Sequence, residues 1–298
     1  MAFIAIDWGS TNCRAWLLEG GQALDSRATG EGIRNVPGGR FEEAFDRLVA
    51  GWEDRAETVL LSGMIASRGG WVETGYVPCP ADVSRLAEGC VERRRGGLRL
   101  FFLPGVSQGP GPGAPADVMR GEELQLLGLG ASGACTAILP GTHSKWARMD
   151  GTRILGFRTM MTGELYHLLL TQSLAGRLAE GDAFDEAAFA VATRRAYGSE
   201  TWLGDLFEAR SGVLLGALPA TAVAAHLSGM LIGRELREGA AAFEAEGAWL
   251  VGEGALCDRY LAAAGAAGLR LRKSAPDLAV EGFRRLAPLL GAPEAGPS

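Results

Sequence analysis

The chain has 298 residues, of which 47% are hydrophobic and 21% are charged, and its formal net charge is −6. This length allows two lobes with a buried core, and the composition is typical of a soluble globular protein. The acidic balance argues against nucleic acid or an anionic membrane as a partner, since the longest basic run is only residues 93–95.

The five cysteines are scattered and lack Cys-x-x-Cys spacing. This pattern argues against a disulfide framework or a zinc site and favours a reducing compartment. The chain enters an apolar strand at once, and no run of 18 apolar residues follows. We therefore expect a cytoplasmic protein that is neither secreted nor embedded in a membrane.

Hydrophobic periodicity and turn residues predict the following elements in the first half of the chain. They are three strands over 3–26, a helix over 41–52, strands at 59–61 and 98–103, and a helix over 117–129. The second half is predicted to contain strands at 135–139, 154–158 and 248–251 and helices over 162–178, much of 181–217, 220–243 and from 255. Ser228, Gly229 and Gly233 predict a close approach of another backbone to the long helix. Strands that alternate with helices make this an α/β chain.

Residues 3–16 are the most informative run, because an apolar strand delivers Asp7 to a small-residue turn of Gly9, Ser10 and Thr11. Gly9 allows an anion to approach the backbone, and the amides and hydroxyls that follow can donate hydrogen bonds to it. Asp7 offers a hard oxygen for magnesium, directly or through water. The run predicts a phosphate-binding turn with a metal carboxylate, and an ordinary polar hairpin is the alternative.

A second copy of this pattern lies in residues 137–148, where Gly141 matches Gly9 and Thr142 matches Ser10. Self-similarity at this spacing predicts two related lobes, residues 1–132 and 133–298. We expect the two turns to grip one triphosphate from both sides.

The second turn offers a different set of side chains, because Leu139 stands where the first copy has Asp7. Lys145 can neutralise phosphate charge, although a lone lysine in a turn is usually solvent-exposed. His143 can donate to a phosphate, and with no second histidine nearby it does not predict a metal site. The candidate phosphate ligands of this turn are Gly141, Thr142, His143, Ser144 and Lys145.

Three further segments follow predicted strands, where ligands of α/β sheets bind. Ser62 and Gly63 are expected near the substrate. Thr162 can cap the next helix or help to hold a substrate carboxylate at the helix start. Gly252 and Gly254, on either side of Glu253, can let a nucleotide lie against bare backbone or can simply form a tight turn.

Phosphoryl transfer to a hydroxyl needs a group that orients or deprotonates the nucleophile. Glu122 and Glu123 are adjacent acids at a predicted helix start, and adjacent helical residues project about 100° apart, so one of them faces a given cleft. We favour Glu122, with Asp7 as the rival base. A solvated first helical turn is the alternative for both glutamates.

Arg68 and Arg120 flank loops that are expected near the cleft, and either can pair with an acidic substrate. Either arginine, taken alone, is more often a surface residue. Trp71 lies on the same predicted loop as Arg68 and suits a small ligand.

Residues 6–16 resemble the first phosphate motif of the actin-like ATPase and sugar kinase superfamily, and residues 139–146 and 250–254 take the places of its second phosphate and adenosine motifs. Four more motifs make the chain similar to the 2-dehydro-3-deoxygalactonokinase family over about residues 3–260. These motifs are residues 62–71, 76–80, 117–123 and 161–165.

The resemblance implies an actin-like ATPase fold of two ribonuclease H-like lobes with an interlobe nucleotide cleft. It implies phosphorylation of 2-dehydro-3-deoxy-D-galactonate on its terminal hydroxyl, with ATP and Mg²⁺, in galactonate catabolism. On this basis the sugar acid lies near residues 62–71. Residues 121–123 are also similar to the acidic segment that carries the catalytic glutamate of exopolyphosphatases, which supports Glu122.

Two other functions stay open from the sequence. One is a phosphohydrolase of the same superfamily, with water as the nucleophile, and the other is an ATP-dependent switch. The preferred sugar acid and the oligomeric state cannot be read from the sequence, with a homodimer as one option.

Overall fold

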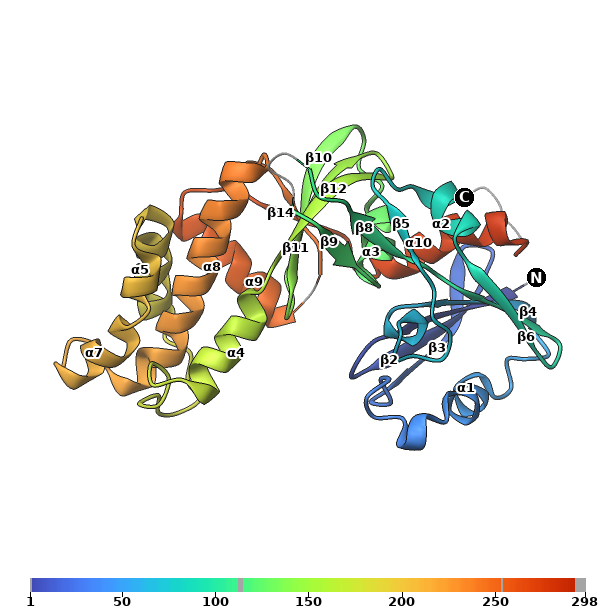
Figure 1. Ribbon diagram of the computed structural model, residues 1–298, viewed down its shortest axis with the longest axis horizontal. Coiled ribbons are helices and arrows are strands. Elements are labelled where there is room, and N and C mark those ends of the chain that lie inside the picture. Colours follow the sequence, from blue (N-terminus) through green and yellow to red (C-terminus); the bar gives the residue numbers. More distant parts are fainter. Residues whose placement is uncertain (1, 112–114, 253, 293–298) are drawn as a thin grey trace. The chain divides into compact units, whose positions relative to one another are not determined.

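The computed structural model describes residues 2–111, 115–252 and 254–292, and Figure 1 shows its helices and strands. The chain divides into two compact units. The first holds residues 2–134, 149–156 and 277–292, and the second holds residues 135–148 and 157–276. The sequence pattern assigns everything after residue 132 to a second lobe, so the two divisions differ at 133–134, 149–156 and 277–292.

The main sheet of the first unit has six strands in the order β3-β2-β1-β4-β7-β6. Strand β1 pairs antiparallel with β2 and parallel with β4, and β4 pairs parallel with β7. The strands are β1 (Ala2–Trp8), β2 (Cys13–Glu19), β3 (Gln22–Thr29), β4 (Ala56–Ser62), β6 (Val91–Arg95) and β7 (Leu98–Phe102).

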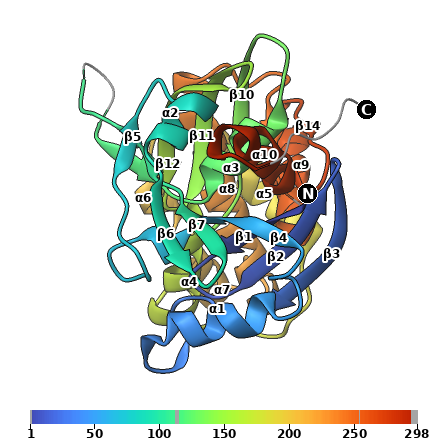
Figure 2. The ribbon, with the colours of Figure 1, turned by 90° about the vertical axis from the view of Figure 1, so that its right-hand side faces the viewer.

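Both faces of this sheet are covered. Ile4 and Ile6 pack on one face with α1 (Phe41–Val49). On the other face, the ring of Trp16 lies 6.5 Å from that of Phe283 in α10 (Leu278–Leu286). Figure 2 shows α1 and α10 on opposite sides of the sheet. Since both faces are occupied, the loops at the carboxyl ends of the parallel strands are where a ligand can bind.

The five-stranded sheet that contains β10 follows the same scheme, in the order β12-β11-β10-β13-β14. Strand β10 pairs parallel with β13, which pairs parallel with β14, as β1, β4 and β7 do in the first sheet. The repeat predicted from the sequence is therefore confirmed in the strand order. The strands are β10 (Ala134–Leu139), β11 (Ser144–Asp150), β12 (Arg153–Met160), β13 (Trp249–Leu250) and β14 (Arg272–Lys273).

The helix predicted over residues 117–129 is wrong in its first part. Residues Asp117–Met119 form strand β9, and α3 (Glu122–Leu129) starts only after Gly121. Gly121 has a φ of 105°, which a helix cannot include. Strand β9 pairs with β8 (Gly105–Gln108), and β8 pairs with β5 (Tyr76–Pro78), in a small sheet that the sequence pattern does not foresee.

The first unit also contains α2 (Val83–Glu88). Two glycines explain why the C-terminal segment, residues 277–292, belongs to this unit. A Cβ atom on Gly128 of α3 would lie 1.9 Å from the carbonyl oxygen of Leu278. A Cβ atom on Gly282 of α10 would lie 2.2 Å from the carbonyl oxygen of Leu124. Because neither glycine carries a side chain, α3 and α10 pack in direct backbone contact.

The second unit is largely helical around its sheet. The close approach predicted for the long helix is confirmed, because a Cβ atom on Gly229 or Gly233 would lie 2.4 or 2.5 Å from backbone oxygens of α5. The helix predicted over 162–178 ends earlier, at Gln172. No helix in the described part of the chain has both the length and the apolar character to cross a bilayer. The helices are α4 (Thr162–Gln172), α5 (Glu186–Gly198), α6 (Trp202–Asp205), α7 (Glu208–Leu214), α8 (Val223–Ala242) and α9 (Gly254–Ala266).

Candidate active site

The turn that follows β1 is fastened from one side by segment 30–35. The carbonyls of Gly9, Ser10 and Thr11 each accept a hydrogen bond from an amide of that segment. The approach is so close that a Cβ atom on Gly32 would lie 2.3 Å from the backbone of Thr11. Within the described residues, the amides of Ser10 and Thr11 donate no hydrogen bond. With its carbonyls engaged, the turn can offer amides and hydroxyls to an anion.

The same turn borders a cavity of about 620 Å³, lined by Asp7, residues 9–14 and residues 28–30. The Asp7 side chain is 23% exposed and accepts a hydrogen bond of 2.8 Å from Nη2 of Arg14. Arg14 lies directly opposite Asp7 in the β1–β2 register. One cavity therefore contains the predicted metal carboxylate, the predicted phosphate turn and a cation.

The end of β4 lies beside Asp7, because Ser62 is opposite Asp7 in the parallel register. Gly63 follows with a φ of 90°, and a Cβ atom there would lie 2.7 Å from the carbonyl oxygen of Trp8 and 3.4 Å from Oδ1 of Asp7. A Cβ atom on Gly121 would lie 3.5 Å from the Cα atom of Gly63. The fold thus brings together Asp7, the predicted substrate residues Ser62 and Gly63, and the start of α3.

The two adjacent acids at the start of α3 have different environments. Glu123 is fully buried, whereas Glu122 is partly exposed. Glu123 accepts hydrogen bonds from the amide of Gly121 at 2.6 Å and from the hydroxyl of Ser62 at 3.2 Å. Burial, reinforced by the nearby Glu122 carboxylate, raises the pKa of Glu123 to about 8. Glu123 therefore braces β4 against α3, and Glu122 is the acid that a ligand can reach.

Arg120, predicted at the substrate, is engaged within the protein. Its guanidinium donates to the hydroxyl of Thr74 at 2.7 Å and to the backbone carbonyls of Thr74, Gly75 and Leu103. It also lies 4.6 Å from the centroid of the Tyr76 ring. Contacts from distant segments therefore engage both Nη atoms of Arg120, while its Nε is buried without a hydrogen-bond partner, and its role at the substrate stays a prediction.

Trp71 is also committed to packing. Its ring lies 5.5 Å from that of Phe45 and 5.3 Å from that of Phe102, and its Nε1 donates to Glu42 at 2.9 Å. It borders a second cavity, separate from the one that contains Asp7. Arg68, by contrast, is exposed on the loop that follows β4.

The second predicted phosphate turn contains Gly141, Thr142 and His143 and lies against the start of α4. A Cβ atom on Gly163 would lie 2.5 Å from the carbonyl oxygen of Gly141. The amide of Glu164 donates to the Thr142 carbonyl at 2.9 Å, and the Glu164 carboxylate lies 2.6 Å from Nε2 of His143. Like the first turn, this one is fastened through a backbone carbonyl.

Ser144 and Lys145 are not loop residues, in contrast to the prediction. Both belong to β11 and are buried. The Ser144 hydroxyl is hydrogen-bonded to the Tyr260 hydroxyl at 2.8 Å, and Nζ of Lys145 donates to the carbonyl of His143 at 3.0 Å. The reason is that strand pairing begins at Ser144 and draws both side chains into the unit.

Thr162 is buried as well and joins a polar network around Glu235 of α8. The carboxylate of Glu235 accepts hydrogen bonds from the Tyr260 hydroxyl at 2.6 Å and from Nε1 of Trp146 at 2.9 Å. Burial raises the pKa of Glu235, while its bonds to Thr162, Tyr260, Trp146 and Ser144 oppose the shift. The network ties β11, α4, α8 and α9 together, so Thr162 is bonded inward.

The predicted adenosine turn contains two glycines in unusual conformations. Gly252 has a φ of 127° and Gly254 has a φ of 75°. A Cβ atom on Gly252 would lie 3.1 Å from Sγ of Cys257. Such a turn exposes backbone, as the nucleotide hypothesis requires. Glu253, between the two glycines, lies outside the described residues.

Magnesium fits the residues around Asp7. The described residues contain no group of three or more His, Cys, Asp or Glu side chains that could hold a metal ion. Magnesium does not need such a cage, because it commonly binds through one or two carboxylates, water and the phosphates of its nucleotide. A partly exposed carboxylate beside a phosphate turn meets this requirement.

Of the other residues near the site, some could have been predicted from the sequence and others could not. Arg14 follows from hairpin register, since an antiparallel pair that turns at residues 9–12 sets residue 14 against Asp7. Glu235 and Tyr260 have no local signal, because they reach Ser144 from helices about a hundred residues away in sequence.

A family model described as 2-keto-3-deoxy-galactonokinase matches residues 7–286. A protein of Escherichia coli (strain K12) named 2-dehydro-3-deoxygalactonokinase is 37% identical over 235 residues, which cover 78% of this chain and 79% of that protein. A crystal structure from Sinorhizobium meliloti with the same activity in its name has a TM-score of 0.85 and 33% identity, over 96% of this chain and 95% of that one. Component A of (R)-2-hydroxyglutaryl-CoA dehydratase from Acidaminococcus fermentans has a TM-score of 0.50 and 13% identity, over 98% of this chain and 97% of that one, which is a likeness of fold alone.

Proposed function

The chain belongs to the 2-keto-3-deoxy-galactonokinase family, and from this membership we infer that it transfers a phosphoryl group from ATP to the terminal hydroxyl of 2-dehydro-3-deoxy-D-galactonate. The product is the 6-phosphate, and the reaction belongs to galactonate catabolism. The actin-like ATPase fold agrees with this activity, as does the shared strand order of the two sheets. The family leaves the phosphohydrolase and the ATP-dependent switch without support.

The main support for the proposed ATP site is the cavity that is lined by both Asp7 and the first predicted phosphate turn. We propose that the amides and hydroxyls of Ser10 and Thr11 bind phosphate oxygens, with Gly9 allowing close approach. Gly141, Thr142 and His143 are proposed to do the same in the second unit, and Gly252 and Gly254 to lie against the adenosine.

Asp7 is proposed to hold magnesium, directly or through water. Magnesium bound with ATP would neutralise phosphate charge as the phosphoryl group is transferred. Arg14, whose Nη2 lies 2.8 Å from Oδ2 of Asp7, keeps that carboxylate oriented in the cavity. Its guanidinium also supplies a positive charge at the edge of the phosphate site.

Glu122 is proposed to orient the attacking hydroxyl, with Asp7 as the rival for this role. The support is its partial exposure at the start of α3, close to Gly63. Glu123 is unsuited to it, because its carboxylate is fully buried and bonded to Gly121 and Ser62. The sugar acid is proposed to lie along the backbone of Gly63, with the exposed Arg68 available to its carboxylate.

We expect the kinase to be cytoplasmic and to need no nucleic acid or membrane partner, since both of its substrates are small and water-soluble.

A coupled assay of ADP release against a panel of 2-keto-3-deoxy sugar acids tests the proposal. We expect Asp7→Asn to lower kcat by at least ~100-fold while the protein remains folded, because it removes a charge beside the transferred phosphoryl group. Asp54→Asn, at an exposed aspartate outside the cavity, is the matched control. Near-normal turnover of Asp7→Asn would exclude the magnesium role.

Glu122→Gln and Glu123→Gln separate the two acids in the same assay. We expect the first to lower kcat and the second to leave turnover largely intact, since Gln can replace a protonated, buried Glu123. Equal and mild effects of both substitutions would remove Glu122 as the base and leave Asp7.

A further inference from the structure

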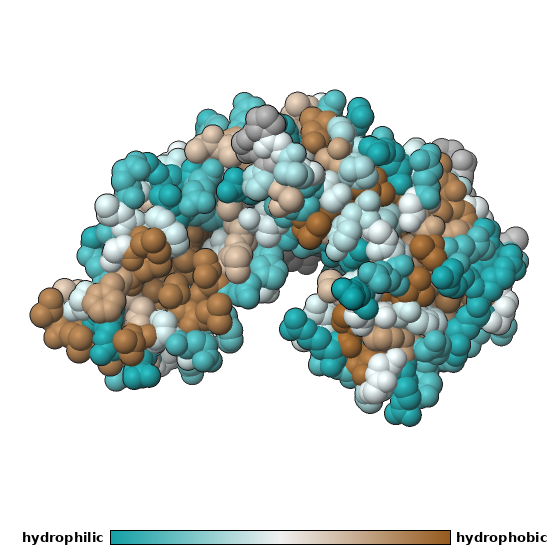
Figure 3. All heavy atoms as spheres, viewed as in Figure 1, coloured by the Kyte–Doolittle hydropathy of each residue, from teal (hydrophilic) through white to brown (hydrophobic). Residues whose placement is uncertain are grey.

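Helices α4, α6 and α7 of the second unit bury few side chains. In α4 only Thr162 is buried, in α7 only Ala209, and in α6 none. The sequence of α4 nevertheless includes four leucines. Figure 3 shows hydrophobic surface gathered over the part of the second unit where Figure 1 shows α4 and α7. Leu165, Leu169 and Leu170 of α4 pack against the core of the unit, so only part of the apolar surface of these helices remains exposed.

Six large apolar side chains, which we call the apolar face, are more than two-fifths exposed. Leu203, Phe207 and Leu214 follow each other at helical spacing, because Leu206 and Phe207 between α6 and α7 keep helical backbone angles. Arg210 of α7 donates to the carbonyl of Leu174 at 3.2 Å, which places Leu174 beside α7. The exposed fractions are 42% for Leu168, 51% for Leu174, 72% for Leu203, 55% for Phe207, 63% for Leu214 and 83% for Leu215.

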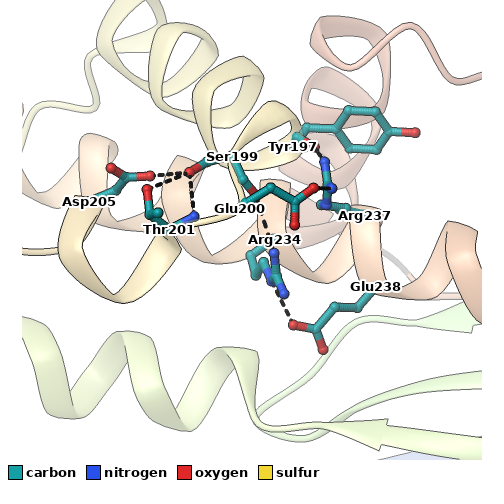
Figure 4. Close-up of polar contacts among 8 residues, drawn as sticks. All are labelled: Tyr197, Ser199, Glu200, Thr201, Asp205, Arg234, Arg237 and Glu238. Carbon is teal, nitrogen blue, oxygen red and sulfur yellow. Dashed lines mark hydrogen bonds and ion pairs between the residues drawn. The ribbon is translucent and has the colours of Figure 1, made fainter.

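The apolar face is presented by an anchored segment. Figure 4 shows polar contacts that tie the connection between α5 and α6 to α8. Arg237 of α8 donates to the carbonyl of Tyr197 at 2.8 Å, and Arg234 donates to that of Ser199 at 3.4 Å. The Ser199 hydroxyl donates in turn to Asp205 of α6. Because this connection is fixed, α6 and α7 hold their apolar residues in one arrangement.

We propose that the apolar face is the interface of a homodimer, in which it meets the same face of a second copy across a twofold axis. A large apolar side chain that is two-fifths to four-fifths exposed presents on the order of 100 Å², so the six present roughly 600 Å². This equals the largest apolar patches of ordinary monomers. With a polar rim it approaches the roughly 800 Å² per partner of a standard interface.

A second copy suits this face better than a membrane surface or a charged partner. An isologous contact needs a surface complementary to itself, and uncharged apolar side chains meet that condition. Helices that lie on membranes carry many Lys and Arg residues, whereas the only cation in α6 and α7 is Arg210. The acids at the edge, Asp205 and Glu208, are already paired with Arg195.

Sedimentation velocity of the full chain over about 1–100 µM tests the proposal. We expect the natural chain to sediment as a dimer. Leu203→Glu combined with Leu215→Glu should raise the dimer dissociation constant at least ~30-fold, because each copy would bury two unpaired charges. The matched control is Leu289→Glu, which lies in the first unit, is 53% exposed and should leave the dimer intact.

If far-UV circular dichroism shows that the double variant does not fold, Leu215→Glu alone is used in its place. Leu215 is so exposed that a charge there leaves folding unaffected, and we expect a rise of about tenfold in the dissociation constant. A natural chain that stays monomeric throughout the concentration range overturns the proposal. So does a folded variant of either kind that dimerises as tightly as the natural chain. Neither result depends on the kinase activity.

Discussion

Replacing Glu123 with Gln changes how the stability of the protein depends on pH. Glu123 is fully buried between β4 and α3, and its pKa is raised from an ordinary 4.5 to about 8. At pH 7 the folded protein therefore keeps this carboxyl protonated, while the unfolded chain ionises it. Gln has the shape of the protonated acid and can keep both hydrogen bonds, to the amide of Gly121 and the hydroxyl of Ser62.

The sign and size follow from proton linkage. Below pH 4.5 both states bind the proton, and above pH 8 neither does. Between these values unfolding releases a proton, so the stability that Glu123 contributes is fully present below pH 4.5 and is lost as the pH rises to 8. Each pH unit is worth about 1.36 kcal/mol, so a raise from 4.5 to 8 corresponds to about 5 kcal/mol in total. Over pH 5 to 8 the expected loss is about 4 kcal/mol.

Urea unfolding of the natural chain and of Glu123→Gln, followed by tryptophan fluorescence at several pH values from 5 to 8, measures this effect. The other carboxylates are common to both proteins and cancel in the difference. We expect Glu123→Gln to become progressively more stable than the natural chain as the pH rises. If the Glu123→Gln difference stays constant within about 1 kcal/mol over pH 5 to 8, the pKa of Glu123 is not raised and the reasoning is refuted.

Gly63→Ala should destabilise the first unit by about 2–4 kcal/mol and lower kcat, because the new Cβ atom would lie 2.7 Å from the carbonyl oxygen of Trp8 at a φ of 90°. An unchanged urea midpoint would show that the turn relaxes freely. Glu235→Ala should cost about 3–5 kcal/mol, because it leaves the Tyr260 hydroxyl and the Trp146 indole without their acceptor. Glu235→Gln keeps an acceptor and should cost far less, and equal losses in the two variants would argue against a hydrogen-bonding role.

The sequence alone was sufficient wherever the signal is local. The apolar run at residues 3–6 and the small-residue turn after Asp7 predicted the first hairpin, and the second copy at 137–148 predicted two related lobes. Gly229 and Gly233 predicted a close helix contact, because only a missing side chain lets two backbones meet. In each case the physical requirement applies to residues that are neighbours along the chain.

Tertiary structure decided which side chains remain available to a ligand. Glu122 and Glu123 are equivalent in sequence, but only Glu123 is enclosed when β4 meets α3. The sequence predicted Arg120 and Thr162 as substrate residues. In the structure, segments far away in sequence form hydrogen bonds with the Nη atoms of Arg120 and with the side chain of Thr162. Burial and the identity of a partner are properties of contacts between distant segments. Local patterns of hydrophobicity and turn residues carry no information about them.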